Sequence, residues 1–167
     1  PAASPKTSVA TPATAAAPNS EGETGGPIPS DAPSVVAKGT GTFTVLDPPE
    51  VANDGAGRRV TYTIEIEGGL DVKPAEFAAE VAQTLLDKRG WQSQDGVHFV
   101  NVTKAEAAAG ARVDIRITLA SPETVDKLCA PAQTRGEVSC FNGGRAVINL
   151  RRWTLGDDAY GDNRDLY

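Results

Sequence analysis

Alternating apolar and polar residues predict several β-strands in the part of the chain that follows residue 34. The clearest run covers residues 59–67, where every second residue is large and apolar. One face of this strand would carry Val60, Tyr62, Ile64 and Ile66, and the other face Thr61, Thr63, Glu65 and Glu67. Weaker runs of the same kind predict further strands at 41–46, 97–102, 111–119 and 146–150.

A helical period predicts one long helix over residues 75–89. Phe77, Val81 and Leu85 recur one turn apart, so an apolar stripe would face the sheet. Pro74 suits the first helical position, where its missing N–H is not needed.

Two shorter signals follow this helix. Trp91 comes directly after Gly90, and we expect its ring to fold back on the helix end as part of the core. Ser121 and Pro122 are a typical helix start, so a short helix is predicted to run from there to about Leu128.

The element order is therefore β-β-α-β-β-α-β. This order predicts an α+β (α/β-like) fold with a mixed, twisted sheet and two helices. Residues 34–167 have the length of one ordinary domain.

Residues 1–33 differ in composition from the rest of the chain. They are rich in Pro, Ala, Ser and Thr and contain almost no large apolar residue, so they cannot offset the entropy cost of ordering. We predict a disordered linker, with a cloning or truncation remnant as the alternative. Because the sequence begins at Pro1 and contains no Met, we expect a signal peptide or membrane anchor upstream.

The net charge and the cysteine content limit which partners and which cellular location are expected. The net charge of −6 argues against nucleic acid, and no apolar run is long enough to cross a bilayer, so the expected membrane link is the upstream anchor alone. Cys129 and Cys140 predict one disulfide, with two buried free thiols as the alternative. A disulfide favours an extracytoplasmic location.

Few residues in the sequence suggest a metal-binding or substrate-binding site. His98 is the only histidine, so a His-rich zinc site is excluded within this sequence. Asp157, Asp158, Asp162 and Asp165 suit either a calcium-binding loop or, as we favour, a solvated acidic loop. Arg145, Arg151 and Arg152 flank the last strand, where they suit either anionic groups of a substrate or pairing with nearby carboxylates.

Several short segments resemble one protein family over residues 39–167. The matching pieces are Arg89-Gly90-Trp91, Leu119-Ala120-Ser121-Pro122, Cys129-Ala130-Pro131, Val138-Ser139-Cys140 with Gly143-Gly144, and Asn149-Leu150-Arg151-Arg152-Trp153. In this order they resemble the extracytoplasmic domain-of-unknown-function family numbered 3152 from high-GC Gram-positive bacteria.

The resemblance implies a zincin-like metallopeptidase fold. Members of the family carry a metzincin-type HExxHxxGxxH helix shortly after a pair like Leu166-Tyr167, which implies a zinc ion and a glutamate base. This sequence contains no such motif, so it would be the upper, sheet-bearing part of the fold, truncated before the metal-binding helix and catalytically incomplete. Zinc is expected only if that helix is present, and a non-catalytic envelope binding or structural module is the alternative.

The resemblance also implies a place for a substrate. In zincin-like folds an edge strand runs beside the active-site helix and pairs with an extended peptide. Arg145, Ile148, Asn149 and Arg151 are the candidate residues for such a cleft-lining strand, and an internal strand leading to the missing helix is the alternative. Without that helix, an apolar sheet face would stay open and favour association.

Overall fold

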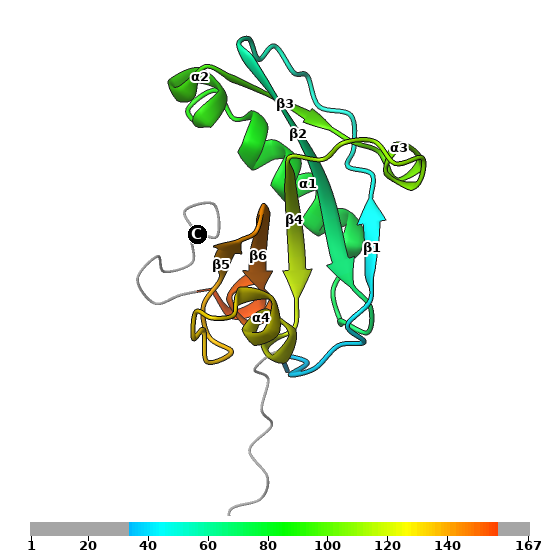
Figure 1. Ribbon diagram of the computed structural model, residues 1–167, viewed down its shortest axis with the longest axis vertical. Coiled ribbons are helices and arrows are strands. Elements are labelled where there is room, and N and C mark those ends of the chain that lie inside the picture. The colour runs from blue at the N-terminus through cyan, green and yellow to red at the C-terminus, as the bar shows by residue number, and fades with distance from the viewer. Residues whose placement is uncertain (1–33, 157–167) are drawn as a thin grey trace, which may run out of the picture. The chain divides into compact units, whose positions relative to one another are not determined.

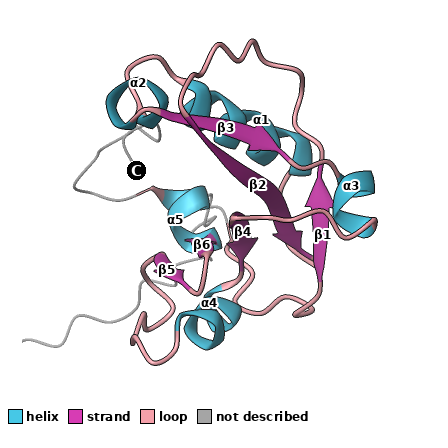
Figure 2. Cartoon of the chain, turned by 45° about the horizontal axis from the view of Figure 1, so that its top comes forward, coloured by secondary structure: helices cyan, strands magenta, loops and turns pink. Residues whose placement is uncertain are grey.

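The computed structural model describes residues 34–156, which form a mixed sheet with helices on both of its faces (Figures 1 and 2). The strands are β1 (Phe43–Leu46), β2 (Arg58–Glu67), β3 (Val97–Asn101), β4 (Ile115–Ala120), β5 (Cys140–Asn142) and β6 (Arg145–Asn149). The helices are α1 (Pro74–Leu86), α2 (Trp91–Asp95), α3 (Lys104–Ala108), α4 (Pro122–Cys129) and α5 (Leu150–Leu155). The linker predicted for residues 1–33 lies outside the described residues.

The sheet has the strand order β1-β2-β4-β6-β5, and β3 pairs with the first half of β2. Strands β2, β4 and β6 run parallel, whereas β1 and β5 run antiparallel to their neighbours. Ile64 of β2 is in register with both Leu46 of β1 and Ile117 of β4, so β2 is paired along both of its edges. The mixed α+β architecture predicted from the sequence is confirmed at this level.

Helix α1 covers one face of the sheet because its apolar stripe meets the apolar side chains of β2. Phe77 and Ala78 are fully buried against Tyr62 and Ile64, and Leu85 closes the end of this core. Burying aromatic and branched side chains of this size contributes about 1.5–3 kcal/mol each.

The opposite face of β2 is also largely buried, although its side chains are polar. Glu67 accepts hydrogen bonds from the N–H groups of Gly41 and Ser121 and from the hydroxyl of Thr124, over 2.7–2.8 Å. These bonds join β2 to the start of the domain and to the first turn of α4. A buried carboxylate is therefore what fixes α4 on this face of the sheet.

The number of helices and the element order differ from the sequence prediction. The described residues contain five helices rather than two, and the additional ones (α2, α3 and α5) are only five or six residues long. Such short segments have too few turns to show a helical period. The capping box formed by Thr103 and Glu106, which starts α3, is the one local signal that could have been read.

The end of the last strand is a further correction. The strand predicted at 146–150 ends at Asn149, and Leu150 already begins α5. Asn149 is the N-cap, because its side-chain oxygen accepts a hydrogen bond from the N–H of Arg151. No helix among residues 34–156 is long and apolar enough to cross a membrane.

Candidate functional site

An apolar groove lies on the sheet face that α1 only partly covers. It encloses about 400 Å³. Helix α1 supplies one wall through Phe77, Val81 and Leu85, and Ile117 and Ile148 of β4 and β6 form its floor. Trp153 of α5 packs edge-on against Phe77 with ring centroids 5.1 Å apart, which closes one end of the groove.

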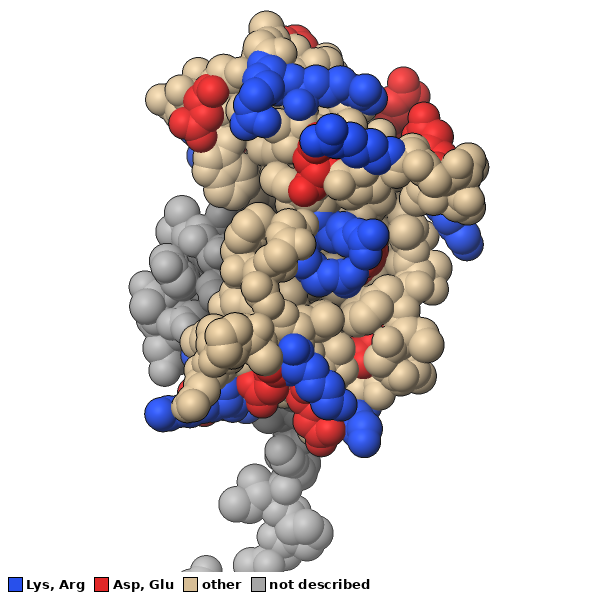
Figure 3. Space-filling view, in the orientation of Figure 1, with Lys and Arg blue, Asp and Glu red and all other residues tan. Residues whose placement is uncertain are grey.

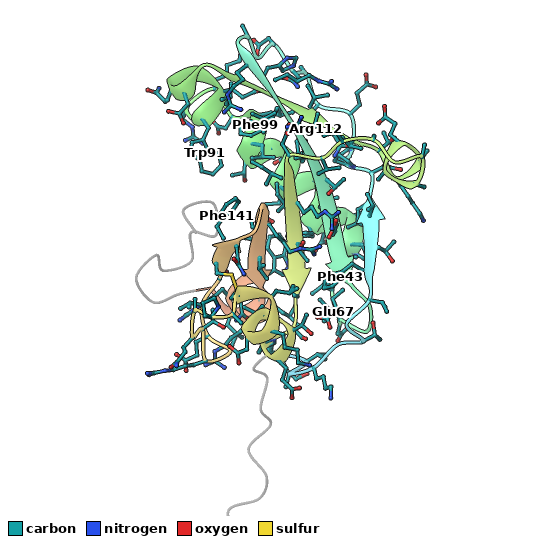
Figure 4. All side chains as sticks on the ribbon, viewed as in Figure 1. Phe43, Glu67, Trp91, Phe99, Arg112 and Phe141 are labelled. Atoms are coloured by element: carbon teal, nitrogen blue, oxygen red, sulfur yellow. A yellow bond between two sulfur atoms is a disulfide. The ribbon has the colours of Figure 1, made fainter. Side chains whose placement is uncertain are left out.

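Two exposed aromatic side chains stand at the rim of this groove. Trp91 at the start of α2 is 53% exposed, and Phe141 of β5 is 66% exposed. Both line the groove, and Figure 4 shows them reaching from α2 and β5 toward the same space. Large aromatic groups in water at the rim of an apolar groove are typical of a surface that a partner or a further segment covers.

Few of the described side chains that line the groove are ionisable. Among the described residues that line it, Glu80 is the one carboxylate, and none is a histidine or cysteine. The hydroxyl of Tyr62 belongs to a buried side chain, and burial raises the pKa of Tyr62 above its ordinary value of 10.0. The lining of the groove therefore suits binding of apolar groups.

Strand β5 gives the groove an open sheet edge. Among residues 34–156, β5 pairs only with β6, so its other edge has backbone groups free to accept a further strand. A two-residue turn, Gly143-Gly144, connects β5 to β6, and both glycines have positive φ (57° and 78°). Such a turn favours glycine at both positions and holds the two strands in fixed register.

A disulfide anchors the start of this edge strand. Cys140, the first residue of β5, is bonded to Cys129, the last residue of α4. The side-chain amide of Asn142 donates to the carbonyls of Leu128 and Ala130, at 2.8 and 3.1 Å. The edge is therefore tied to α4 at both of its ends, and the predicted disulfide is confirmed.

One family model matches residues 29–167, which is most of the chain, and its description is "Protein of unknown function (DUF3152)". The chain belongs to this family. No curated protein and no solved structure matches the chain significantly. The resemblance inferred from the sequence is confirmed as far as the family itself.

In this DUF3152 domain, the four residues expected to line a cleft do not share one surface. Ile148 lies in the floor of the groove, whereas Arg145 projects from the opposite face of the sheet. Asn149 is fully buried at the start of α5, and Arg151 lies in the first turn of that helix. β6 lies between β4 and β5, so on this side of the sheet the edge strand among residues 34–156 is β5.

Arg145 instead forms a buried ion pair. One guanidinium nitrogen (Nη1) lies 2.8 Å from Oε2 of Glu65 and 2.9 Å from the hydroxyl of Thr118. The guanidinium also lies over the ring of Phe43, 5.1 Å from its centroid. Of the two roles weighed for this arginine, pairing with a carboxylate of the domain is the one observed.

The structure offers no zinc site within the described residues. No group of three His, Cys, Asp or Glu side chains among residues 34–156 is placed to hold a metal ion. His98 lies on β3, in register with Arg59 of β2. The side chains of residues 34–156 therefore do not by themselves form a catalytic zinc site. The proposed acidic loop from Asp157 to Asp165 lies outside the described residues.

The sequence did not reveal the aromatic rim of the groove. Trp91 was expected in the core, but it begins a helix and more than half of its surface is exposed. Phe141 was not singled out. Its position between Cys140 and Gly143-Gly144 is a hairpin signal that could have placed it on an edge strand.

Proposed function

We propose that residues 34–156 are the sheet-bearing part of a zincin-like metallopeptidase domain, exported or anchored at the outer face of the membrane. In this proposal the domain is catalytically incomplete by itself. The zinc ligands and the glutamate base would come from a helix outside this sequence, as the family resemblance implies. The domain would supply the scaffold and a binding edge for an extended peptide.

The groove is the observation that carries this proposal. An apolar hollow of about 400 Å³, walled by α1 and floored by β4 and β6, has the lining that an additional apolar helix face requires. Helix α5, which directly follows β6, packs Trp153 into one end of the groove, so the chain leaves the sheet beside it.

The open edge of β5 supports the peptide part of the proposal. A peptide in extended conformation would add as a strand beside Cys140–Asn142, with its backbone paired to β5 and alternate side chains directed toward Phe141. The anchoring of β5 by the disulfide and by Asn142 supports this role, because a rigid edge loses little entropy on pairing. The disulfide also fits an oxidising, extracytoplasmic compartment.

The decisive experiment compares this chain with the protein encoded by the complete reading frame. We expect the complete protein to contain one zinc ion by metal analysis and to hydrolyse an unfolded protein substrate, with loss of activity after chelation. The present chain should show neither property. A complete protein without zinc would overturn the peptidase proposal and favour a non-catalytic envelope module.

A substitution in the groove tests whether the proposed additional helix packs there. Ile148→Asp places a charge in the groove floor, and it should destabilise the complete protein more than the present chain, because only the former would bury that position fully. Val138→Asp is the matched control, since Val138 is exposed and does not line the groove. If Ile148→Asp lowered the stability of both proteins equally, the result would contradict the proposal that a further helix packs in the groove.

A further inference from the structure

The sheet face opposite the apolar groove carries a hollow rimmed by arginines. Figure 3 shows Lys and Arg side chains gathered over β2 and β4 on this face. The hollow encloses about 550 Å³, and its lining includes Arg58, Arg59 and Arg112 together with the polar side chains of Thr61 and Asn101. A cationic surface in a chain of net charge −6 is a local feature that its overall charge does not predict.

Strand register extends this cationic surface along the sheet. Arg59 and Thr63 lie on the same face of β2, and Thr63 is in register with Arg116 of β4. Arg116 is in turn in register with Arg145 of β6. Thr63 lies four positions after Arg59 along the strand, so the cationic groups extend over about 13 Å.

The carboxylates on this face are bonded to the domain itself. Asp114 accepts from the N–H and hydroxyl of Thr61, and Glu106 accepts from those of Thr103. Glu65, whose side chain is 8% exposed, lies within the sheet beside Arg145. These carboxylates reduce the positive charge of the face, but they leave guanidinium groups as the groups that reach solvent.

The arginines differ in how far they are neutralised. Arg112 pairs with Asp114, and Arg116, which is 55% exposed, lies 3.7 Å from Glu65. No ion pair within 4 Å among residues 34–156 involves Arg58 or Arg59. The charge of Arg59 still acts on Glu106: the N–H and hydroxyl of Thr103 and, to a smaller extent, Arg59 lower the pKa of that carboxyl. Arg59, which forms no close ion pair, and Arg116, whose pair with Glu65 is long, keep N–H donors that can contact an anion.

The polar groups around these arginines select the type of anion. Guanidinium groups bind phosphate oxygens in bidentate fashion, and threonine hydroxyls add further donors. The exposed aromatic residues Trp91 and Phe141 line the groove on the other face, and the ring of Phe43 on this face is covered by the guanidinium of Arg145. These three rings therefore offer no free platform on this face for nucleic-acid bases to stack on. A ligand here would present phosphates and no bases.

We propose that this face binds a linear phosphate polymer without aromatic bases, lying along β2 from Arg59 toward Arg116. A length of about 13 Å requires more than one phosphate group, which is why a polymer fits better than a single ion. The proposal concerns the opposite face of the sheet from the groove, and it holds whether or not the domain belongs to a peptidase.

The test measures binding of short-chain inorganic polyphosphate to the full chain at low and at physiological salt. The double variant Arg59→Gln/Arg116→Gln should bind at least about tenfold more weakly and with a smaller salt dependence, since two phosphate contacts are lost. Lys73→Gln/Lys88→Gln removes the same charge from exposed positions elsewhere and should bind like the unmodified chain. Thermal melting of all variants checks that they are folded.

Three results would overturn the proposal. The first is that the unmodified chain does not bind polyphosphate even at low salt, and the second is that the lysine variant loses as much affinity as the arginine variant. The third is binding to phosphatidylglycerol vesicles without binding to polyphosphate, which would identify a lipid surface as the ligand. Arg59→Lys/Arg116→Lys keeps the charge and should bind more tightly than the glutamine variant. Equal loss in both would be a fourth result against the proposal, because keeping the positive charge would then contribute nothing to binding.

Discussion

Two buried carboxylates, those of Glu65 and Glu67, hold the elements that pack on the polar face of the sheet. Glu67 and Glu65 alternate with apolar residues on β2, a pattern that by itself predicts only which side chains share a face. In the structure both carboxylates are buried and hydrogen-bonded, one to the first turn of α4 and the other to β4 and β6. The partners in α4, β4 and β6 lie more than fifty residues away in the chain, so no local pattern could have identified them.

Replacing Glu67 by Gln should lower the free energy of unfolding at neutral pH by about 1.5–3 kcal/mol. The variant would lose charge-assisted hydrogen bonds from Gly41, Ser121 and Thr124, and its amide group would place a donor among donors. Urea unfolding measures the change. Glu123→Gln is the control, because Glu123 is exposed and forms only a 3.9 Å ion pair with Lys38.

The same carboxylate should make the stability of the domain depend on acid pH. Burial raises the pKa of Glu67, but the hydrogen bonds from Ser121, Thr124 and Gly41 outweigh burial and hold it below its ordinary value of 4.5. A depressed pKa in the folded state means that the stabilisation is complete above that value and is lost as the pH falls through the folded pKa. The unfolding free energy of the unmodified chain should fall more steeply below about pH 5 than that of Glu67→Gln. Parallel pH profiles for the two proteins would contradict this assignment.

Arg145 is the cation closest to the buried carboxylate of Glu65, at 2.8 Å. Arg145→Met leaves Glu65 buried without its closest cation and should cost about 3–5 kcal/mol of unfolding free energy. The double variant Glu65→Gln/Arg145→Met removes the unpaired charge and should recover part of this loss. A double variant less stable than Arg145→Met alone would show that Glu65 has enough partners without the arginine.

At the scale of elements, the predictable parts are those whose packing follows from a long period. The bounds of β2 and α1 agree within a few residues with the predicted strand at 59–67 and helix at 75–89. Each of these elements is long enough for the period of its apolar residues to be recognised in the sequence. Helices α2, α3 and α5 were missed because each spans at most two turns. The groove was missed for a different reason, since its walls come from elements far apart in sequence.

The disulfide should contribute to the stability of the hairpin formed by β5 and β6. The bridged cysteines are 11 residues apart, and closing such a loop in the unfolded chain is worth about 3 kcal/mol on the chain-entropy model. Cys129→Ser/Cys140→Ser should therefore unfold at lower urea concentration, and hydrogen exchange should become faster at β5 than at β2. Unchanged protection at β5 would mean that Asn142 and the Gly143-Gly144 turn hold the edge strand without the disulfide.

At the scale of the whole molecule, the apolar groove predicts association between copies of the chain. Trp91 and Phe141 expose large apolar rings at the rim, and the floor below them is formed by β4 and β6. Sedimentation at increasing protein concentration should show oligomers of the chain, and Trp91→Ser/Phe141→Ser should remain monomeric over a wider range. A cooperative melt of a strictly monomeric unmodified chain would contradict this prediction and weaken the inferred need for a covering helix.

The parallel arrangement of β2, β4 and β6 has a consequence for how the protein is made. Ile64 and Ile117, which face each other across β2 and β4, are separated by more than fifty positions, and β6 closes the sheet only at Asn149. On a ribosome, the central strands would emerge long before their partners, so the sheet cannot be completed until synthesis has passed that point.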